Sequence, residues 1–249
     1  LRSLSSTDKI GDFDLAVISK NVQKEITDLI TANTSFDSVT IKGKSQYRLL
    51  GFNTNVSESN ATGILGTQLA GTEGSFFGWA ELRGFKAFVA DSDMFNSTET
   101  ILFANAGGYV YKMEDGNSLD GNNIEATFFT PFVTLNDPQL RKTIYKLHLY
   151  TDPAGSINTT VNLKFDFDED DAIQPAPITL SNTTQEVSIY GRSTSVFGTS
   201  TFGGKLKKVF TTQTIGSGFN VALQFTSSDT FPPFSLDAAV LEFGTFDRR

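Results

Sequence analysis

The stretch from residue 113 to residue 132, MEDGNSLDGNNIEATFFTPF, concentrates side chains that could bind a metal ion or act as acids. It places Glu114, Asp115 and Asp120 among Asn and Gly residues, directly before an aromatic run. Carboxylate oxygens are the ligands that Ca²⁺ prefers, and carboxyl groups also serve as catalytic acids and bases. The stretch is therefore either an ion-binding or catalytic site, or the junction between two pieces of β-structure.

Calcium fits the spacing of this stretch poorly. A calcium loop needs oxygen ligands at alternate positions, a Gly at the sharp turn and a bidentate carboxylate at its end. Counted from Asp115, Asn117 fits, but Leu119 stands at a ligand position. Asp120 takes the place of the Gly, and Ala126 takes the place of the closing acid. Because Asp, Asn and Gly tolerate left-handed backbone conformations, we predict turns here and keep a site as the alternative.

A second acidic run, FDFDEDDA at residues 165–172, is also a candidate cation site. Asp166 and Asp168 would share one face if a strand continued through them, while residues 169–171 would lie in a loop. The run has no Gly turn and no terminal bidentate partner, so a solvated acidic loop is the favoured interpretation. Two carboxylates of this run could in principle hydrolyse a glycosidic bond. That mechanism depends on the distance between the two carboxyl groups, which the sequence does not give.

His148 is the only histidine, and any Ser-His-Asp triad would have to use it. No nucleophile motif accompanies it, so we predict a strand histidine that faces solvent or a neighbour. Residues 198–205, GTSTFGGK, lack the spacing of a phosphate-binding loop, and we predict a flexible loop. Residues 205–208, KLKK, are predicted to be a polar strand face or a partner contact. We expect no catalytic, cofactor-binding or metal-binding residues and no enzymatic activity.

Composition narrows the function further. The 249 residues contain no Cys, which excludes disulfides and thiolate chemistry and fits assembly in a reducing cytosol. A net charge of −8 opposes general affinity for nucleic acid or anionic lipid. No apolar stretch approaches the length of about 20 residues that a membrane helix needs, so no membrane insertion is expected. Six Asn-x-Ser/Thr sequons are expected by chance in so Asn-, Ser- and Thr-rich a chain, and the start at Leu1 suggests a fragment of a longer polypeptide.

One short amphipathic helix is predicted near the N-terminus, within residues 18–33, with Ser19 placed to cap it. Its apolar stripe, at helical spacing, consists of Val22, Ile26, Leu29 and Ile30. Short apolar runs bounded by turn residues follow and predict propeller-like meanders. Residues 106–108, Ala-Gly-Gly, are predicted to form a hairpin turn, and the polar, Gly-rich residues 53–74 a long exposed loop.

Longer strands are predicted after Asp120. One of them should place alternate residues on its buried face, namely Ile157, Val161, Leu163, Phe165 and Phe167. This change from short to longer strands puts a domain boundary near residues 115–121. We therefore predict an all-β fold, with propeller-type meanders and one helix in residues 1–117, part of a larger propeller, and a β-sandwich-like platform domain in residues 118–249.

Several stretches, in this order, carry a family resemblance. They are LRSL at the start, GDFDLAVISKNVQKEI, SQYRLLG at 45–51, GGYVYKMEDGNSLDGNNIEATFFTPF at 107–132, DPQLRKTIYKLHLY at 137–150, and AAVLEFGTFDRR at the end. Together they resemble the C-terminal part of the tail nozzle proteins of short-tailed bacteriophages, also described as tail hub, tubular or packaged-DNA stabilisation proteins. The match extends from end to end of the chain, and its motifs are mostly turn and strand signatures.

The resemblance implies a virion structural protein of the tail, assembled in the host bacterial cytoplasm. Such a protein forms a ring, commonly hexameric, below the portal and its adaptor protein, contacts tail fibres or other tail proteins, and lets double-stranded DNA pass without sequence-specific binding. By the same resemblance Asp120, Gly121 and Ile124 mark the strand that enters the second domain, and Arg141 and Lys142 begin the next strand. The alternative from another class is a carbohydrate- or receptor-binding β-module of a tail fibre or cell-surface protein.

Overall fold

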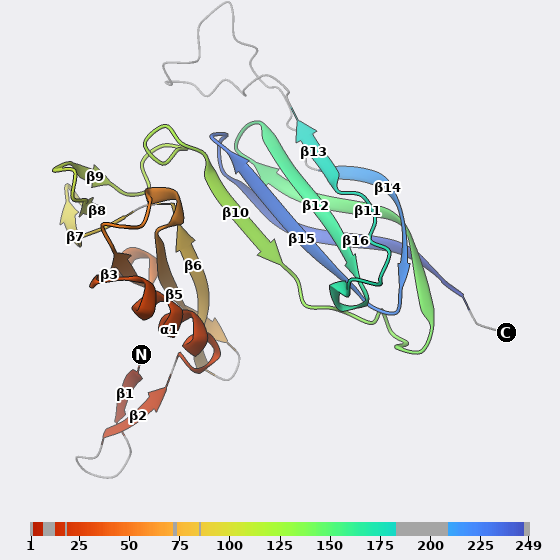
Figure 1. The fold of residues 1–249 in the computed structure, drawn as a ribbon, viewed down its shortest axis with the longest axis horizontal. Helices are drawn as coiled ribbons and strands as arrows, with labels where there is room; N and C mark the ends of the chain where they lie inside the picture. Colours follow the sequence, from red (N-terminus) through yellow and green to blue (C-terminus); the bar gives the residue numbers. More distant parts are fainter. Residues whose placement is uncertain are drawn as a thin grey trace, which may run out of the picture. The chain divides into compact units, whose positions relative to one another are not determined.

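The structure is a computed structural model, in which two compact units, Leu1–Gly116 and Asn117–Arg249, are described in turn. The description covers residues 2–6, 13–17, 19–71, 74–84, 86–182 and 209–246. Strands in several antiparallel sheets and one short α-helix make up most of these residues (Figure 1), so the predicted all-β class is confirmed. The division between the units falls within the stretch from 113 to 132 that the sequence singles out.

The first unit contains the predicted helix. A hairpin, β1 (Arg2–Ser6) and β2 (Phe13–Val17), is followed by a 3₁₀ turn, η1 (Lys20–Val22), and by α1 (Gln23–Ala32). Leu29 is buried as predicted, whereas Ile30 is exposed, so the apolar stripe is narrower than expected. Ser19 precedes η1 but makes no side-chain capping bond there, and the predicted cap is wrong. On the solvent side Lys24 and Asp28 form an i,i+4 ion pair at 2.6 Å.

A four-stranded meander follows the helix. It comprises β3 (Ser35–Ile41), β4 (Gln46–Phe52), β5 (Thr62–Gly71) and β6 (Gly74–Arg83), with the 3₁₀ turns η2 (Lys42–Lys44) and η3 (Glu58–Asn60). The predicted loop at 53–74 is wrong, because β5 occupies half of it. Its glycines admit the neighbouring strands: a Cβ at Gly63 would lie 2.8 Å from the Leu49 carbonyl oxygen, and one at Gly66 would lie 2.5 Å from the Trp79 ring. Here Gly marks close packing and not a loop.

A second meander completes the first unit: β7 (Val89–Phe95), β8 (Thr98–Ala104) and β9 (Val110–Lys112). Gly108 has a φ of 81° in the turn between β8 and β9, which confirms the hairpin predicted at 106–108. One face of this sheet contributes Ala90 and Ile101 to a core shared with Val39, Ile41 and Leu50 of the four-stranded sheet. The first unit contains two meanders, whereas a propeller typically has about four to eight blades. The larger propeller therefore stays a prediction.

The second unit has two antiparallel sheets around one core. Its strands are β10 (Ile124–Phe129), β11 (Arg141–Pro153), β12 (Ile157–Phe165), β13 (Ile178–Asn182), β14 (Val209–Gly218), β15 (Val221–Asp229) and β16 (Phe234–Phe246). The sheet orders are β10-β15-β12-β13 and β14-β11-β16 (Figure 1). Buried apolar side chains from both sheets form a single cluster. Strand β10 begins at Ile124 and β11 at Arg141, as the resemblance implied.

Strand β12 shows the predicted alternation up to Phe165. Ile157, Val161, Leu163 and Phe165 are buried, but Phe167 is exposed, and its predicted place on the buried face is wrong. The strand ends because residues 166–168 all have positive φ and form a 3₁₀ turn, η4 (Asp166–Asp168). The Phe219 amide donates to the Asp166 carboxylate at 2.7 Å and holds this turn.

Strand β11 also carries a charged side chain into the interior. Lys142 is only 1 % exposed, and its Nζ donates to the backbone carbonyls of Asp137 and Phe219. These carbonyls supply the hydrogen bonds that the buried ammonium group would otherwise lack.

Candidate functional site

The stretch at 113–132 forms turns, as predicted. Positive φ angles occur at Glu114, Gly116, Asp120 and Gly121. In the second unit Leu119 and Asn122 exchange backbone hydrogen bonds of 2.9 and 3.0 Å, which closes a tight turn around Asp120 and Gly121. In the first unit Glu114 pairs with Lys44 and Arg48, and Asp115 pairs with Lys112 at 3.0 Å, so both carboxylates are held in ion pairs.

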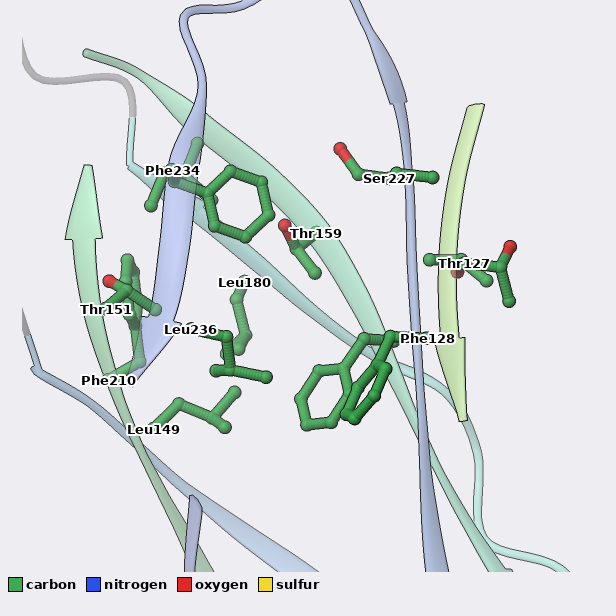
Figure 2. A pocket seen from close by; sticks show the side chains of 14 residues that line it. Thr127, Phe128, Leu149, Thr151, Thr159, Leu180, Phe210, Ser227, Phe234 and Leu236 are labelled. Carbon is green, nitrogen blue, oxygen red and sulfur yellow. The ribbon is translucent and has the colours of Figure 1, made fainter. Parts of the chain in front are cut away.

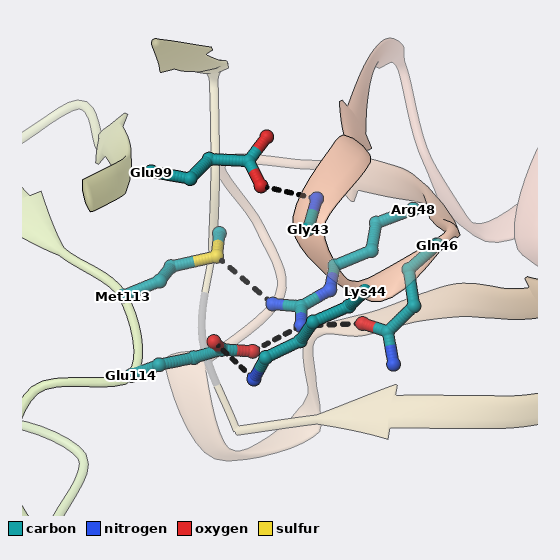
Figure 3. Close-up of polar contacts among 7 residues, drawn as sticks. All are labelled: Gly43, Lys44, Gln46, Arg48, Glu99, Met113 and Glu114. Carbon is teal, nitrogen blue, oxygen red and sulfur yellow. Dashed lines mark hydrogen bonds and ion pairs between the residues drawn. The ribbon is translucent and has the colours of Figure 1, made fainter. Parts of the chain in front are cut away.

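Glu114 belongs to a charge cluster around the buried Arg48 in the first unit (Figure 3). Its carboxylate pairs with the guanidinium of Arg48, which is 6 % exposed, and accepts from Lys44 Nζ at 2.5 Å. Arg48 also donates to Gln46 Oε1 at 2.9 Å and contacts the Met113 sulfur at 3.5 Å. Burial raises the pKa of Glu114, but the hydrogen bonds from Lys44 and Arg48 outweigh it and hold the pKa below its ordinary value. Arg48 was not singled out from the sequence.

Glu99 ties the β7–β9 sheet to the turn between β3 and β4 (Figure 3). Its carboxylate accepts from the backbone amides of Lys42 at 2.8 Å and Gly43 at 2.6 Å, in the η2 turn. The amide of Gly43, followed by that of Lys42, lowers the pKa of Glu99. Because these donors are backbone groups, we assign Glu99 a structural role.

The acidic run at 165–172 is dispersed. Asp166 and Asp168 do not share a strand face, because η4 replaces the strand. Asp166 holds the amide of Phe219, and Asp168 pairs with Lys164 at 2.9 Å. Residues 169–171 lie in a loop, as predicted. Among the residues that the structure describes, no three His, Asp or Glu side chains lie close enough together to hold a metal ion.

His148 lies on the face of its sheet that points away from the core. Its Nδ1 is 3.0 Å from Thr211 Oγ1 and its Nε2 is 2.9 Å from the Glu242 carboxylate, on the two flanking strands. Hydrogen bonds from His148 and then Lys146 lower the pKa of Glu242. The order hydroxyl, imidazole, carboxylate is that of a catalytic triad, but here Nδ1 faces the hydroxyl and Nε2 the carboxylate, the reverse of the Ser-His-Asp arrangement. The prediction of a strand histidine that faces a neighbour is confirmed.

A different surface has the character of a binding site: the outer face of β7–β9, formed by Val89, Phe95, Leu102 and Val110. These four side chains are between 43 and 71 % exposed. Cross-strand pairing places Val89, Ala104 and Val110 in one row, and Asp91, Leu102 and Lys112 in the next. The opposite face of the same sheet is in the core, so the exposed apolar groups lie on a rigid support. Contiguous exposed apolar patches mark protein or membrane interaction sites, ligand-binding grooves or aggregation-prone surfaces.

The segments at 198–205 and 205–208 lie outside the described residues, so their predicted roles stay predictions. None of the described helices has the length or the apolar character to cross a lipid bilayer.

Comparison with known proteins adds little to this geometry. No family model matches the chain, and no curated protein matches it. The structure is similar to that of a glycoside hydrolase family 43 arabinoxylan arabinofuranohydrolase from Bacillus subtilis in complex with cellotetraose, at 11 % identity and a TM-score of 0.20. The match covers 82 % of this chain and 53 % of that one, so the chain spans about half the length of the hydrolase. At this TM-score the similarity carries no argument.

Proposed function

We propose that this protein is a non-enzymatic structural subunit of a bacteriophage tail, in the nozzle ring below the portal and adaptor. The proposal is supported by the ordered sequence stretches that resemble tail nozzle proteins and by the outer face of β7–β9, the observation that carries it. Copies of the chain would surround the DNA exit channel, retain the genome and guide it during ejection. The adaptor protein and tail fibres would be neighbours, and the virion tail would be its location.

The outer face of β7–β9 suits contact between copies. In a closed ring each copy buries one patch against a different patch of the next copy. Apolar side chains supply affinity, and the charged residues among them, Asp91 and Lys112, give the contact a preferred orientation. A net charge of −8 suits a channel wall that repels phosphate, so that DNA slides instead of adhering.

The oligomeric state of the purified protein tests this proposal. We expect rings in negative-stain images and a ring-sized mass in light scattering. Val110→Asp should shift the population toward monomers, because it buries a charge in the contact. Ile173→Asp, at an exposed apolar position in the second unit, is the matched control and should leave the rings intact. A monomeric wild-type protein, or rings unaffected by Val110→Asp, would refute the assembly role of this face.

A carbohydrate- or receptor-binding module is the second candidate, favoured by an aromatic cluster in the second unit. The rings of Phe129 and Phe132 lie 5.7 Å apart, and those of Phe132 and Phe167 lie 5.1 Å apart, with Phe129 and Phe167 exposed. Exposed rings of this kind can stack on sugar faces. A glycan array distinguishes the candidates: saturable sugar binding by a monomer, lost in Phe167→Ser, would favour the module.

A further inference from the structure

The core of the second unit contains a partly open cavity of about 320 Å³ (Figure 2). It lies between the two sheets, and both contribute to its walls. Most of the lining is apolar and includes four Phe side chains. The lining residues are Ala126, Thr127, Phe128, Leu149, Thr151, Ile157, Thr159, Leu180, Phe210, Phe225, Thr226, Ser227, Phe234 and Leu236. This volume lies within the range of sites that bind small molecules, about 300 to 1,000 Å³.

Two hydroxyl groups in the wall have no hydrogen-bond partner. Thr151 lies on β11 and Thr159 on β12, so the two side chains come from facing sheets (Figure 2). Each residue is only 5 % exposed, and neither Oγ1 makes a hydrogen bond in the structure. Both occupy inward positions on their strands, where the neighbouring inward residues are apolar. A buried hydroxyl without a partner destabilises a fold. Protein atoms cover both Oγ1 atoms, so each threonine must rotate about χ1 before its hydroxyl can bond a ligand in the cavity.

The cavity wall carries no ionisable side chain. A charged ligand would lose its hydration without gaining a counter-charge, which is unfavourable. The rings of Phe128 and Phe225 stack at 6.1 Å and form part of the wall, so hydrocarbon or aromatic ligand atoms find a matching surface. Phe128 lies on the edge strand β10 and is exposed, which gives solvent access to this side of the wall.

We propose that this cavity binds an uncharged, mainly hydrocarbon molecule with one hydroxyl or carbonyl group, which hydrogen-bonds to Thr151 and Thr159 once their side chains have rotated toward it. At the packing density of protein interiors the volume accommodates roughly 12 non-hydrogen atoms, as in a medium-chain alcohol. The inference is independent of the proposed tail function, because it concerns only side chains of the second unit.

Calorimetric titration with 1-octanol tests the proposal. We expect saturable binding of one molecule per chain. Sodium octanoate at pH 8 has the same chain length but a carboxylate, and should bind at least tenfold more weakly. Absence of saturable 1-octanol binding, or equal binding of octanoate, would overturn the proposal.

Variants of the two threonines test the role of the hydroxyl groups. Thr151→Val and Thr159→Val retain side-chain shape, and each should weaken 1-octanol binding by about three- to tenfold, the effect of one lost hydrogen bond. Neither should lower the melting temperature without ligand, because an unpartnered hydroxyl is removed. Thr160→Val, one residue along β12 and outside the cavity, is the control and should bind as wild type. Unchanged affinity in both cavity variants would exclude hydrogen bonding by these threonines.

Discussion

Arg48 has almost no exposure to water, and the Glu114 carboxylate supplies its counter-charge. The two residues are 66 positions apart in the sequence, so their pairing depends on the turn that ends β9. A buried cation that loses its partner is strongly destabilising, whereas an exposed pair contributes little. The stability of the first unit should therefore depend on this pair far more than on its surface ion pairs.

Replacing Glu114 tests this dependence. We expect Glu114→Gln to lower the unfolding free energy of the first unit by about 2 kcal/mol at pH 7, since Glu114 is partly exposed. Urea titration followed by fluorescence of Trp79, the single Trp, measures the change. Glu81→Gln is the control, because its pair with Arg83 is exposed, and it should cost less than about 0.5 kcal/mol.

The stability difference between wild type and Glu114→Gln should change with pH in a definite direction. The pKa of Glu114 is lowered in the folded state, so its contribution is complete above the unfolded pKa, about 4.3, and is lost as the pH falls through the folded value. The difference between wild type and Glu114→Gln should therefore shrink below pH 4. A constant difference down to pH 2 would mean that the charge of Glu114 is not what stabilises the unit.

At the scale of elements, strand β5 depends on glycines that let a neighbour come close. Gly66→Ala places a Cβ 2.5 Å from the Trp79 ring, which is itself held in a stack with Phe77. We expect a loss of about 1 to 3 kcal/mol in unfolding free energy, as in other overpacked sites. Gly78→Ala is the matched control, because the closest contact of its Cβ would be the flexible end of Leu69, at 3.1 Å. Equal effects of the two variants would contradict this explanation.

Sequence patterns predicted those elements whose signals are local. The alternation in β12, the Gly turn before β9 and most of α1 depend on residues within one segment. Strand β5 was missed, because its glycines indicate a loop unless the Trp79 ring opposite Gly66 is known. Phe167 was misplaced, because its strand ends through positive φ angles at Asp and Phe residues, which no turn motif indicates.

The functional surfaces were less predictable than the strands. The cavity joins Thr151 and Thr159, which read in the sequence as ordinary strand residues, and only the facing of two sheets shows that neither hydroxyl has a partner. The outer face of β7–β9 likewise combines residues from three strands. The sequence shows alternating apolar residues in these strands, but it does not show which face of the sheet packs against the core.

At the scale of the whole molecule, the two units should unfold as separate entities. All sheet partners of the described strands of the second unit lie within residues 117–249. We expect this fragment, produced alone, to give the circular dichroism spectrum of a β-protein and a cooperative thermal transition. In the complete protein Trp79 fluorescence should report only the unfolding of the first unit. Glu114→Gln should leave the unfolding transition of the second unit unchanged. A fragment that remains unfolded would show that the second unit needs the first.

The buried amine of Lys142 has a consequence for covalent footprinting. Acylating reagents modify the lysines at the surface, whereas this one is sealed beneath the carbonyls of Asp137 and Phe219. Its acylation requires that the β11 end of the second unit opens. The acylation rate of the peptide that contains Lys142, followed by mass spectrometry, would therefore measure local opening of that unit.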